Sequence, residues 1–493
     1  MDTKHADQSN FIGPLREFRC RLGDTDAVSA LEAGLVGKDA KIEGPFGVKD
    51  LVYADYVASG RALMQVERFV FEEVLPYYAN SHTEASYCGG FITRLRREAR
   101  AAIAACCGAG KDHAVIFAGS GATAGLNRLV KLLGVADAVA VGKRVLIIVG
   151  PYEHHSNILP WRESGSEVIE IAECAAGGPD LAQLDAALSR PSDLTVCSFS
   201  AASNVTGIIT DVEAVTRKVK AAGARMVWDY AGAGPYMPIA MSFGGGAEID
   251  AAVLSPHKFI GGPGASGVLI LRRDAAVTSK PSWPGGGTVR FVSTTGHDYS
   301  DSLEAREEAG TPNIIGDIRA ALAFLIKDAL DADAMQARNA ALTRRAIAAW
   351  RGVERLELLG PLGPQRLPIF SFRVKDGKGG HVHQQLVTRM LSDRFGIQAR
   401  GGCSCAGPYA HRLLSIDAEQ SERMRQAILS GQEMMKPGFT RLNFSVLLSD
   451  EKVKFILDAV AQLAADATFY EPQYDFDASR AIFFPRAAEE HAA

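Results

Sequence analysis

The sequence predicts an α/β protein whose main part is a mostly parallel sheet of seven strands covered by helices, followed by a smaller α+β unit. Short apolar runs rich in β-branched residues recur between residues 114 and 271, and helical patterns lie between most of them. Strands that alternate with helices at this spacing form parallel sheets. The predicted strands are Ala114–Phe117, Arg144–Val149, Glu167–Ile171, Leu194–Phe199, Met226–Trp228, Ala251–Leu254 and Gly267–Leu271.

The sequence pattern divides the chain into four parts. We expect an N-terminal arm over residues 1–50, a large domain over 51–330, a small α+β domain over 331–466 that includes part of the arm, and a C-terminal tail over 467–493. A long helical pattern from about residue 315 to 350, interrupted near Asp331–Asp333, links the two domains. Within the small domain the pattern predicts strands near 367–374 and 440–446, helices near 382–395 and 450–466, and a loop at 400–412.

Composition excludes several classes of protein. The chain has 493 residues, of which 47% are hydrophobic and 22% charged, and its net charge is -4. This balance gives no electrostatic reason to expect nucleic acid or an anionic membrane as a partner. No run of eighteen apolar residues predicts a membrane span, and the N-terminus has no apolar signal region. Eight scattered cysteines without a CxxC pair predict reduced thiols in a cytoplasm and no metal site.

Lys258 is the first candidate for chemistry. It follows the predicted strand Ala251–Leu254 and precedes the glycine-rich turn Gly261–Gly267. A lysine at such a position suits an amine that is partly desolvated, and such an amine forms a Schiff base readily at neutral pH. A surface lysine after a strand is the alternative reading of this residue taken alone.

A glycine-rich turn follows the strand Ala114–Phe117 and opens a helix. Its residues Gly121, Ala122 and Thr123 offer backbone N–H groups and the positive end of a helix dipole to a phosphate. The same turn also matches the dinucleotide pattern G-x-G-x-x-A at Gly119, Gly121 and Ala124, but no acidic residue follows a second strand at the usual distance.

Three further strand ends carry polar side chains. After Val149 comes Glu-His-His-Ser-Asn, in which His154 is suited to stacking on a flat ring, although a loop histidine bonded to backbone is the simpler alternative. Asn204 follows the strand that ends at Phe199. Asp229 ends a buried strand and needs a cationic or donor partner, which a protonated pyridine nitrogen or a capped turn would supply.

These groups together describe a site for pyridoxal phosphate. They are a phosphate cup, a stacking ring, an amide, a carboxylate for a ring nitrogen and a lysine for an aldehyde. Because the carboxyl ends of parallel strands meet at one edge of a sheet, we expect them to converge.

On these motifs the sequence resembles the class V aminotransferase family of fold type I pyridoxal-phosphate enzymes, and within it the cysteine desulfurase and selenocysteine lyase branch. The resemblance covers about residues 50–465. It implies that Lys258 holds the cofactor, with the residues that match the family's other cofactor positions around it. These are Gly121, Ala122, Thr123, His154, Asn204, Asp229, Ser255, His257 and Thr311.

The resemblance also implies a homodimer and an amino-acid substrate. Thr311, in Gly-Thr-Pro-Asn, matches the threonine that reaches the phosphate of the neighbouring subunit. Arg441 matches the arginine that grips the substrate carboxylate, a task suited to a bidentate guanidinium, with Asn204 close to the substrate. A sulfur-acceptor protein is a further partner that the branch implies.

Cys405 matches the cysteine that takes sulfur from the substrate. It lies in Arg-Gly-Gly-Cys-Ser-Cys-Ala-Gly-Pro, where desulfurases of the branch carry Arg-x-Gly-His-His-Cys-Ala-x-Pro. The two histidines are therefore replaced by Cys403 and Ser404, and Gly232 stands where the family has glutamine or histidine. A small residue packed in the loop is the alternative reading of Cys405.

The sequence thus favours a pyridoxal-phosphate-dependent cysteine desulfurase with Lys258, Cys405 and His154 as catalytic residues. A class V aminotransferase, an epimerase or another pyridoxal-phosphate lyase is the second hypothesis, because of Gly232, Cys403 and Ser404. A non-catalytic or dinucleotide-binding α/β protein is the third.

Overall fold

The structure is a computed structural model that describes residues 13–23, 26–81 and 83–486. It consists of two compact units. The large unit comprises the described residues up to Val36 together with Ala58–Ser203 and Ile209–Gln336. The small unit comprises Gly37–Val57, Asn204–Ile208 and the described residues from Ala337 onward. The predicted boundary at residue 330 falls just before helix α12, Ala332–Trp350, which begins in the large unit and ends in the small one.

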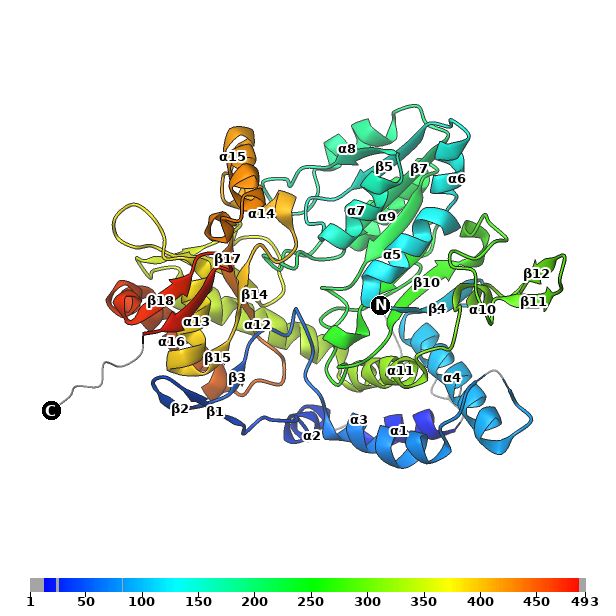
Figure 1. Ribbon diagram of the computed structural model, residues 1–493, viewed down its shortest axis with the longest axis horizontal. Helices are drawn as coiled ribbons and strands as arrows, with labels where there is room; N and C mark the ends of the chain where they lie inside the picture. The colour runs from blue at the N-terminus through cyan, green and yellow to red at the C-terminus, as the bar shows by residue number, and fades with distance from the viewer. Residues whose placement is uncertain (1–12, 24–25, 82, 487–493) are drawn as a thin grey trace. The chain divides into compact units, whose positions relative to one another are not determined.

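The large unit is built on the predicted seven-stranded sheet (Figure 1). Its strand order is β4-β10-β9-β8-β7-β5-β6, and only β10 runs antiparallel to its neighbours. The mostly parallel sheet is therefore confirmed. The strands are β4 (His113–Gly119), β5 (Val145–Val149), β6 (Glu167–Glu170), β7 (Leu194–Ser200), β8 (Arg225–Asp229), β9 (Ala251–Leu254) and β10 (Gly267–Arg272).

These strands are continuous apolar runs in the sequence because their side chains are buried. Every residue of β5 and β9 is buried, as expected for parallel strands with helices on both faces of the sheet. Alternate residues of β4, namely Ala114, Ile116 and Ala118, join one core with the apolar face of helix α5 (Gly121–Leu132). Helix α9 (Val212–Ala221) packs on β8, and α11 (Ile314–Ala329) packs on α4 (Tyr87–Cys106).

Helix caps fix the loops that lead away from this sheet. Asn313 caps α11 by accepting a hydrogen bond from the Gly316 N–H over 3.1 Å. Ser86 caps α4 in the same way, with the N–H of Gly89 at 3.1 Å. These caps place the starts of two long helices that lie against each other.

The small unit is an α+β structure of its own, as predicted. Its four-stranded antiparallel sheet has the order β13-β14-β17-β16, formed by Leu356–Leu358, Ile369–Val374, Phe439–Asn443 and Arg400–Gly402. Helices α13 (Gln384–Phe395) and α16 (Asp450–Tyr470) pack on each other, and their apolar faces share a core with Trp350 and Phe370. A core of this kind gives the unit a fold that does not depend on local propensity alone.

At the ends of the chain, the sequence pattern predicts a short helix around residues 26–35 and a short strand within residues 51–60, and the structure contains further elements that were not predicted. The described part of the predicted arm forms α1 (Pro14–Arg21) and α2 (Ala27–Ala33) in the large unit and the hairpin β1 (Lys41–Gly44) and β2 (Gly47–Asp50) in the small unit. Strand β3 (Val52–Tyr53) pairs in parallel with β15 (Ile397–Gln398). In the predicted tail, α16 continues to Tyr470, and β18 (Tyr474–Asp477) pairs with β19 (Ile482–Pro485). Short strands that pair over long sequence distances leave little periodic signal.

The predicted loop at 400–412 is wrong in detail. Strand β16 occupies its first residues and helix α14 (Gly407–Leu413) its last. β16 exists because it pairs with β17, and α14 begins with a proline in its first turn, where the missing N–H costs nothing. Only Cys403–Ala406 remains as a connecting turn.

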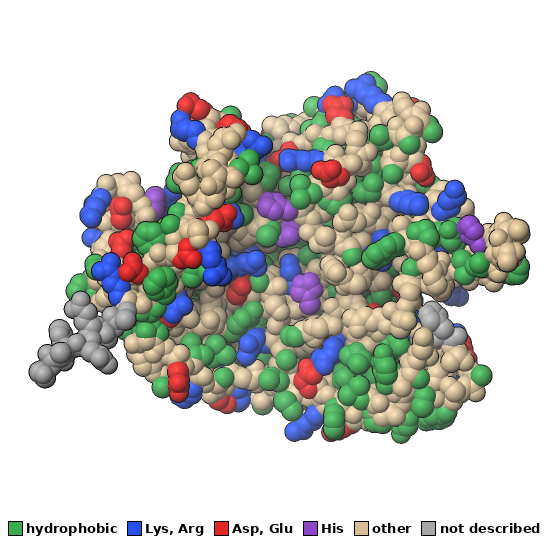
Figure 2. Space-filling model, viewed as in Figure 1, with side chains coloured by type: hydrophobic (Ala, Val, Ile, Leu, Met, Phe, Trp, Pro, Cys, Tyr) green, Lys and Arg blue, Asp and Glu red, His purple; other side chains and the backbone are tan. Residues whose placement is uncertain are grey.

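The surface shows charges of both signs. On the face drawn in Figure 2, Lys and Arg side chains alternate with Asp and Glu, as the net charge of -4 suggests. Hydrophobic side chains gather on the part of the large unit formed by α1 and α3 (Met64–Phe69), where Met64, Phe71 and Leu75 are exposed. Among the described helices, none is long and apolar enough to span a membrane.

Candidate active site

Lys258 lies at the carboxyl end of β9, in a single turn of 3₁₀ helix formed by Pro256–Lys258. Its N–H donates to the Ser255 carbonyl oxygen over 2.9 Å, and the side chain is half-buried. Asp229 ends the neighbouring strand β8 and is 5% exposed. Burial raises the pKa of Asp229, and the Lys258 ammonium group opposes that rise. The predicted carboxylate and the predicted lysine therefore act on each other electrostatically.

The glycine-rich turn meets the residues that precede Lys258. The Ala122 N–H donates to Ser255 Oγ over 3.0 Å. Gly121 has φ 67°, and a Cβ there would lie 2.9 Å from Ser255 Oγ and 3.0 Å from His257 Cε1. Only glycine satisfies both the backbone angle and this close approach. Burial and, to a smaller extent, the charge of Lys258 together lower the pKa of His257 to about 4, so the imidazole is neutral at pH 7.

Thr123 is connected to the predicted stacking residue His154 through Ser156. The Thr123 and Ser156 hydroxyls are 2.7 Å apart, and Ser156 Oγ lies 3.0 Å from His154 Nδ1. The Ser156 N–H donates to the same Nδ1 over 3.1 Å, which places the proton of a neutral imidazole on Nε2. The role of Ser156 was not predicted, since it occupies the variable position of the Glu-His-His-Ser-Asn motif.

Glu153 belongs to the same motif and is buried. Ser200 donates to its carboxyl group through its N–H over 2.8 Å and through Oγ over 2.7 Å, and Asn157 Nδ2 donates as well. Burial nevertheless raises the pKa of Glu153 to about 8, because three donors do not replace the lost hydration. This network joins β7 to the turn that presents His154.

The small unit holds the other predicted residues. Asn204, expected beside the large sheet, belongs to the small unit, where its Nδ2 donates to the Ser404 carbonyl oxygen over 2.9 Å. Arg441 of β17 is 2% exposed. It donates through Nη1 to the Asn204 carbonyl oxygen over 3.0 Å and through Nη2 to Asp55 Oδ1 over 2.9 Å. Asp55 was not predicted, because it lies 386 residues away in sequence.

Cys405 lies in the turn Cys403–Ala406, which we call the cysteine turn. The Ala406 N–H donates to the Cys403 carbonyl oxygen over 3.1 Å and closes the turn. Its central residues, Ser404 and Cys405, have φ 54° and 55°. Left-handed backbone is uncommon for residues other than glycine, and two such residues in succession mark a local strain.

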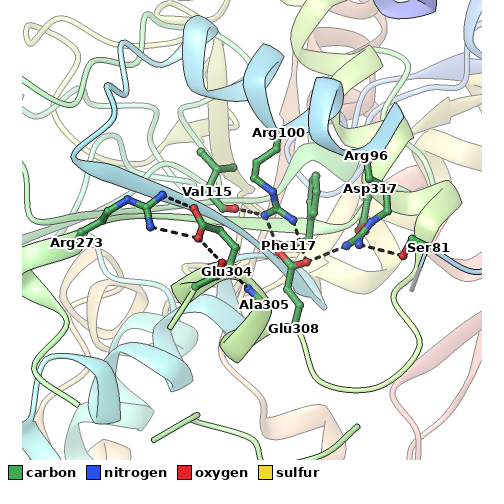
Figure 3. Close-up of polar contacts among 11 residues, drawn as sticks. Ser81, Arg96, Arg100, Val115, Phe117, Arg273, Glu304, Ala305, Glu308 and Asp317 are labelled. Carbon is green, nitrogen blue, oxygen red and sulfur yellow. Dashed lines mark hydrogen bonds and ion pairs between the residues drawn. The ribbon is translucent and has the colours of Figure 1, made fainter. Parts of the chain in front are cut away.

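Thr311 belongs to an exposed loop whose two ends are fixed. Asn313 caps α11 at one end, as described above. At the other end Glu308 accepts hydrogen bonds from Arg96 Nη2 and Arg100 Nη1, each over 2.8 Å, and lies beside the ring of Phe117 (Figure 3). The loop therefore presents Thr311 outward from a rigid base.

The same carboxylate connects this loop to the phosphate cup. Glu308 Oε1 accepts the Phe117 N–H over 2.8 Å, two residues before Gly119. Arg96 also donates to Asp317 over 2.9 Å, and Figure 3 shows the two arginines pointing from α4 toward the acidic side chains. This cluster borders a cavity of about 360 Å³. Neither Glu308 nor the arginines were singled out in the sequence, where charged residues on a helix are common.

Comparison with known proteins identifies the family. The family model described as Aminotransferase class-V matches residues 52–436. The chain belongs to this family. The predicted resemblance is therefore confirmed.

Class V relatives of this chain include named enzymes. A cysteine desulfurase of Enterobacter sp. is 31% identical over 363 residues, which is 73% of this chain and 85% of that protein. A cysteine desulfurase of Dickeya dadantii is 29% identical over 368 residues, or 73% and 84%. The apo structure of cysteine desulfurase from Thermococcus onnurineus NA1 has a TM-score of 0.71 at 24% identity and covers 89% of this chain and 98% of that one. The predicted fold is confirmed.

Each unit brings together some of the residues singled out in the sequence. The large unit brings together Gly121, Ala122, Ser255 and His257, and it places Asp229 close enough to Lys258 for their charges to interact. The small unit brings together Asn204, Arg441 and the cysteine turn. Across the part of the chain that the structure describes, no group of three or more His, Cys, Asp or Glu side chains is arranged to hold a metal ion.

Proposed function

We propose that the protein is a pyridoxal-phosphate-dependent cysteine desulfurase, which removes sulfur from L-cysteine and releases alanine. The observation that carries this function is a half-buried cysteine, Cys405, held in a strained turn that is anchored by Asn204. Relatives with about 30% identity that are named cysteine desulfurases support it. The large unit supplies most of the residues that would hold the cofactor.

The residues around Lys258 fit a phosphorylated, cationic ring. The close approach of Gly121 to Ser255 and His257 makes a small cradle of N–H and O–H groups at the start of a helix, which suits a phosphate. The raised pKa of Asp229 shows a buried carboxylate that a cationic ring nitrogen would stabilise. His154, fixed by Ser156, would lie against the ring. The full set that we propose for the cofactor is Gly121, Ala122, Thr123, His154, Asn204, Asp229, Ser255, His257, Lys258 and, from the neighbouring subunit, Thr311.

Pyridoxal phosphate, when bound, supplies an aldehyde for an amine and a conjugated ring that withdraws electrons from the substrate Cα. Lys258 would hold the aldehyde, and its amine would move the proton at the substrate Cα. Arg441 binds the substrate carboxylate, with Asp55 and the Asn204 carbonyl group holding the guanidinium in orientation.

Cys405 carries the sulfur step. Its thiolate attacks the sulfur atom of the substrate, so that a bond forms between the two sulfur atoms and the bond from sulfur to Cβ breaks. The electron pair of the broken bond stays with the carbon skeleton, which takes up protons and leaves as alanine. Cys405 is left as a persulfide, whose outer sulfur atom passes to an acceptor.

The test is to incubate the holoenzyme with L-cysteine and measure alanine, with Cys405→Ala as the variant and Cys88→Ser as the matched control. Cys88 is a half-buried thiol in α4. We expect alanine production from the wild type and from the control and its loss in Cys405→Ala. Normal alanine production by Cys405→Ala would refute the sulfur-accepting role.

A second candidate function keeps the cofactor and changes the reaction to transamination, epimerisation or another lyase reaction. It is favoured by Gly232, which provides no side chain where the family has glutamine or histidine. Release of keto acid or of the opposite enantiomer from a panel of amino acids, without persulfide on Cys405, would support it. Alanine released together with a persulfide on the protein would count against it.

We also propose that the protein acts as a homodimer, in which Thr311 serves the neighbouring site. Support comes from exposed aromatic side chains of the large unit: Phe71 is 71% exposed and Tyr87 is 69% exposed. Tyr87 contacts Tyr77, and Ser81 of the same segment accepts a hydrogen bond from Arg96, the partner of Glu308. An apolar patch of this kind is typical of protein interfaces. Sedimentation of the wild type as a monomer at micromolar concentration would refute the dimer.

All eight cysteines are free thiols, which suits the cytoplasmic location that we propose. A fractionation experiment that found the protein in an oxidising compartment would contradict it.

A further inference from the structure

The cysteine turn contains two thiols, and the second has no counterpart in the desulfurase pattern. Cys403 is the first residue of the turn and Cys405 the third, and the turn is closed by the hydrogen bond from Ala406 to Cys403. A hydrogen-bonded β-turn folds the chain back on itself, so its first and third residues are close neighbours. Disulfides join residues whose Cα atoms are about 4.4–6.8 Å apart, which is the range expected for such neighbours.

Both thiols of the turn are accessible, whereas those of Cys107 and Cys197 are buried. Cys403 and Cys405 are half-buried, with Ser404 between them 7% exposed. Cys107 is fully buried, and burial raises the pKa of its thiol to about 12. Burial also raises the pKa of the Cys197 thiol. The two cysteines of the turn are thus free to react, while Cys107 and Cys197 behave as apolar core residues.

The surroundings hold the turn in a conformation that costs free energy. A left-handed backbone is unfavourable for residues other than glycine, and the turn has two such residues in succession. Ser404 adds a further cost, because its Oγ is buried and has no hydrogen-bond partner within the described part of the chain. Asn204 Nδ2 compensates in part by binding the Ser404 carbonyl oxygen. Strain retained at such a position is typical of functional sites.

We propose that Cys403 is a resolving thiol, which cleaves the persulfide formed on Cys405 and releases the sulfur as hydrosulfide. This inference rests on the proposed desulfurase function. The Cys403 thiolate attacks Cys405 Sγ, a new S–S bond forms between the two cysteines, and the bond from Cys405 Sγ to the outer sulfur breaks. The electron pair of that bond leaves with the outer sulfur as HS⁻. No oxidant is consumed, because the oxidised S–S bond is exchanged and not created.

The step has a consequence for turnover. Each cycle leaves a disulfide between Cys403 and Cys405, so an external dithiol must reduce it before Cys405 can accept sulfur again. The enzyme would therefore couple cysteine breakdown to dithiol oxidation, with alanine and hydrosulfide as products. A desulfurase without the second thiol instead keeps its persulfide until an acceptor removes it.

The test is a single-turnover experiment on the holoenzyme, which is first reduced and then freed of reductant. After one equivalent of L-cysteine per chain has reacted, intact mass and peptide mapping report the state of the two cysteines. We expect about one hydrosulfide per chain from the wild type, which becomes lighter by two hydrogen atoms, with a Cys403–Cys405 disulfide in the mapped peptide. Cys403→Ser should form alanine, become heavier by one sulfur atom and release no hydrosulfide.

Cys88→Ser is the matched control, because it removes one half-buried thiol outside the turn, and it should behave as the wild type does. A wild type that forms alanine and keeps a persulfide on Cys405 would overturn the resolving role and leave the proposed function intact. If no protein forms alanine, the proposed function itself fails. The wild-type peptide map decides the matter even if Cys403→Ser does not fold.

Discussion

The glycine-rich turn after β4 and the cysteine turn both have successive or alternate residues with positive φ, and they meet that requirement in different ways. In the large unit, Gly119 and Gly121 have φ 68° and 67° and adopt this backbone at little cost. In the small unit, Ser404 and Cys405 adopt φ 54° and 55° with side chains present. The glycine turn offers backbone N–H groups, which need no side chain, whereas the cysteine turn must present a thiol.

The two turns expose different chemical groups. At the glycine turn, a Cβ would collide with Ser255 and His257, so the backbone itself is the functional group. At the cysteine turn, replacing Cys405 by glycine would relax the backbone but remove the sulfur. If Cys405 is the sulfur-accepting residue that we propose, strain at this position is the consequence of placing a reactive side chain where glycine would be more stable.

Replacing Cys405 by glycine should separate function from stability. We expect alanine production from L-cysteine to fall by roughly a thousandfold or more, because the nucleophile is lost. We expect the free energy of unfolding to rise by about 1 kcal/mol, because the left-handed strain is relieved. Steady-state kinetics and urea unfolding measure the two effects. Cys405→Ala should lose activity equally without the gain in stability; a Cys405→Gly protein less stable than Cys405→Ala would mean that the turn is not strained.

The buried carboxyl group of Glu153 makes the stability of the large unit depend on pH. The folded pKa of Glu153, about 8, lies above the ordinary value of 4.5, so the folded protein holds a proton that the unfolded chain has lost. Its contribution to stability is therefore present below pH 4.5 and is lost as pH rises toward 8, at about 1.4 kcal/mol per pH unit. Between pH 5 and 9, the free energy of unfolding measured with urea should fall less in Glu153→Gln than in the wild type. Equal slopes would show that Glu153 is ionised in the folded state.

Replacing Gly121 by alanine should damage the glycine turn more than the same change at Gly119. Both residues have positive φ, which costs about 1–2 kcal/mol with a side chain. A Cβ at Gly121 also meets Ser255 and His257, while a Cβ at Gly119 has nothing within 4 Å. Urea unfolding and absorbance titration with pyridoxal phosphate should show larger losses of stability and cofactor affinity for Gly121→Ala. Equal losses in the two variants would exclude the close contact as the cause.

The smallest expected effect is at Ser404. Ser404→Gly removes both a left-handed side chain and a buried hydroxyl without a described partner, so it should stabilise the protein by about 0.5–1 kcal/mol. The matched control is Ser415→Gly, where φ is 53° and the residue is exposed outside the turn. The midpoint temperature of thermal unfolding should rise in both variants, and it should rise more in Ser404→Gly. A destabilised Ser404→Gly would show that the hydroxyl has a partner of its own.

The sequence by itself determined the features that depend on near neighbours. The seven strands are short apolar runs between helices, and Gly121, Asp229 and Lys258 follow strand ends, so periodicity and turn chemistry were sufficient to predict where they lie. The interruption between α11 and α12 was also visible, at Asp331–Asp333.

Only the tertiary structure decided the features that depend on distant partners. It paired Arg441 with Asp55, joined Glu308 to the N–H of Phe117 and anchored the cysteine turn to Asn204, across separations of 386, 191 and 200 residues. It also gave Ser404 and Cys405 a backbone that neither residue type prefers. Local propensity carries no information about such contacts, because their free energy is gained only when the whole chain has folded around them.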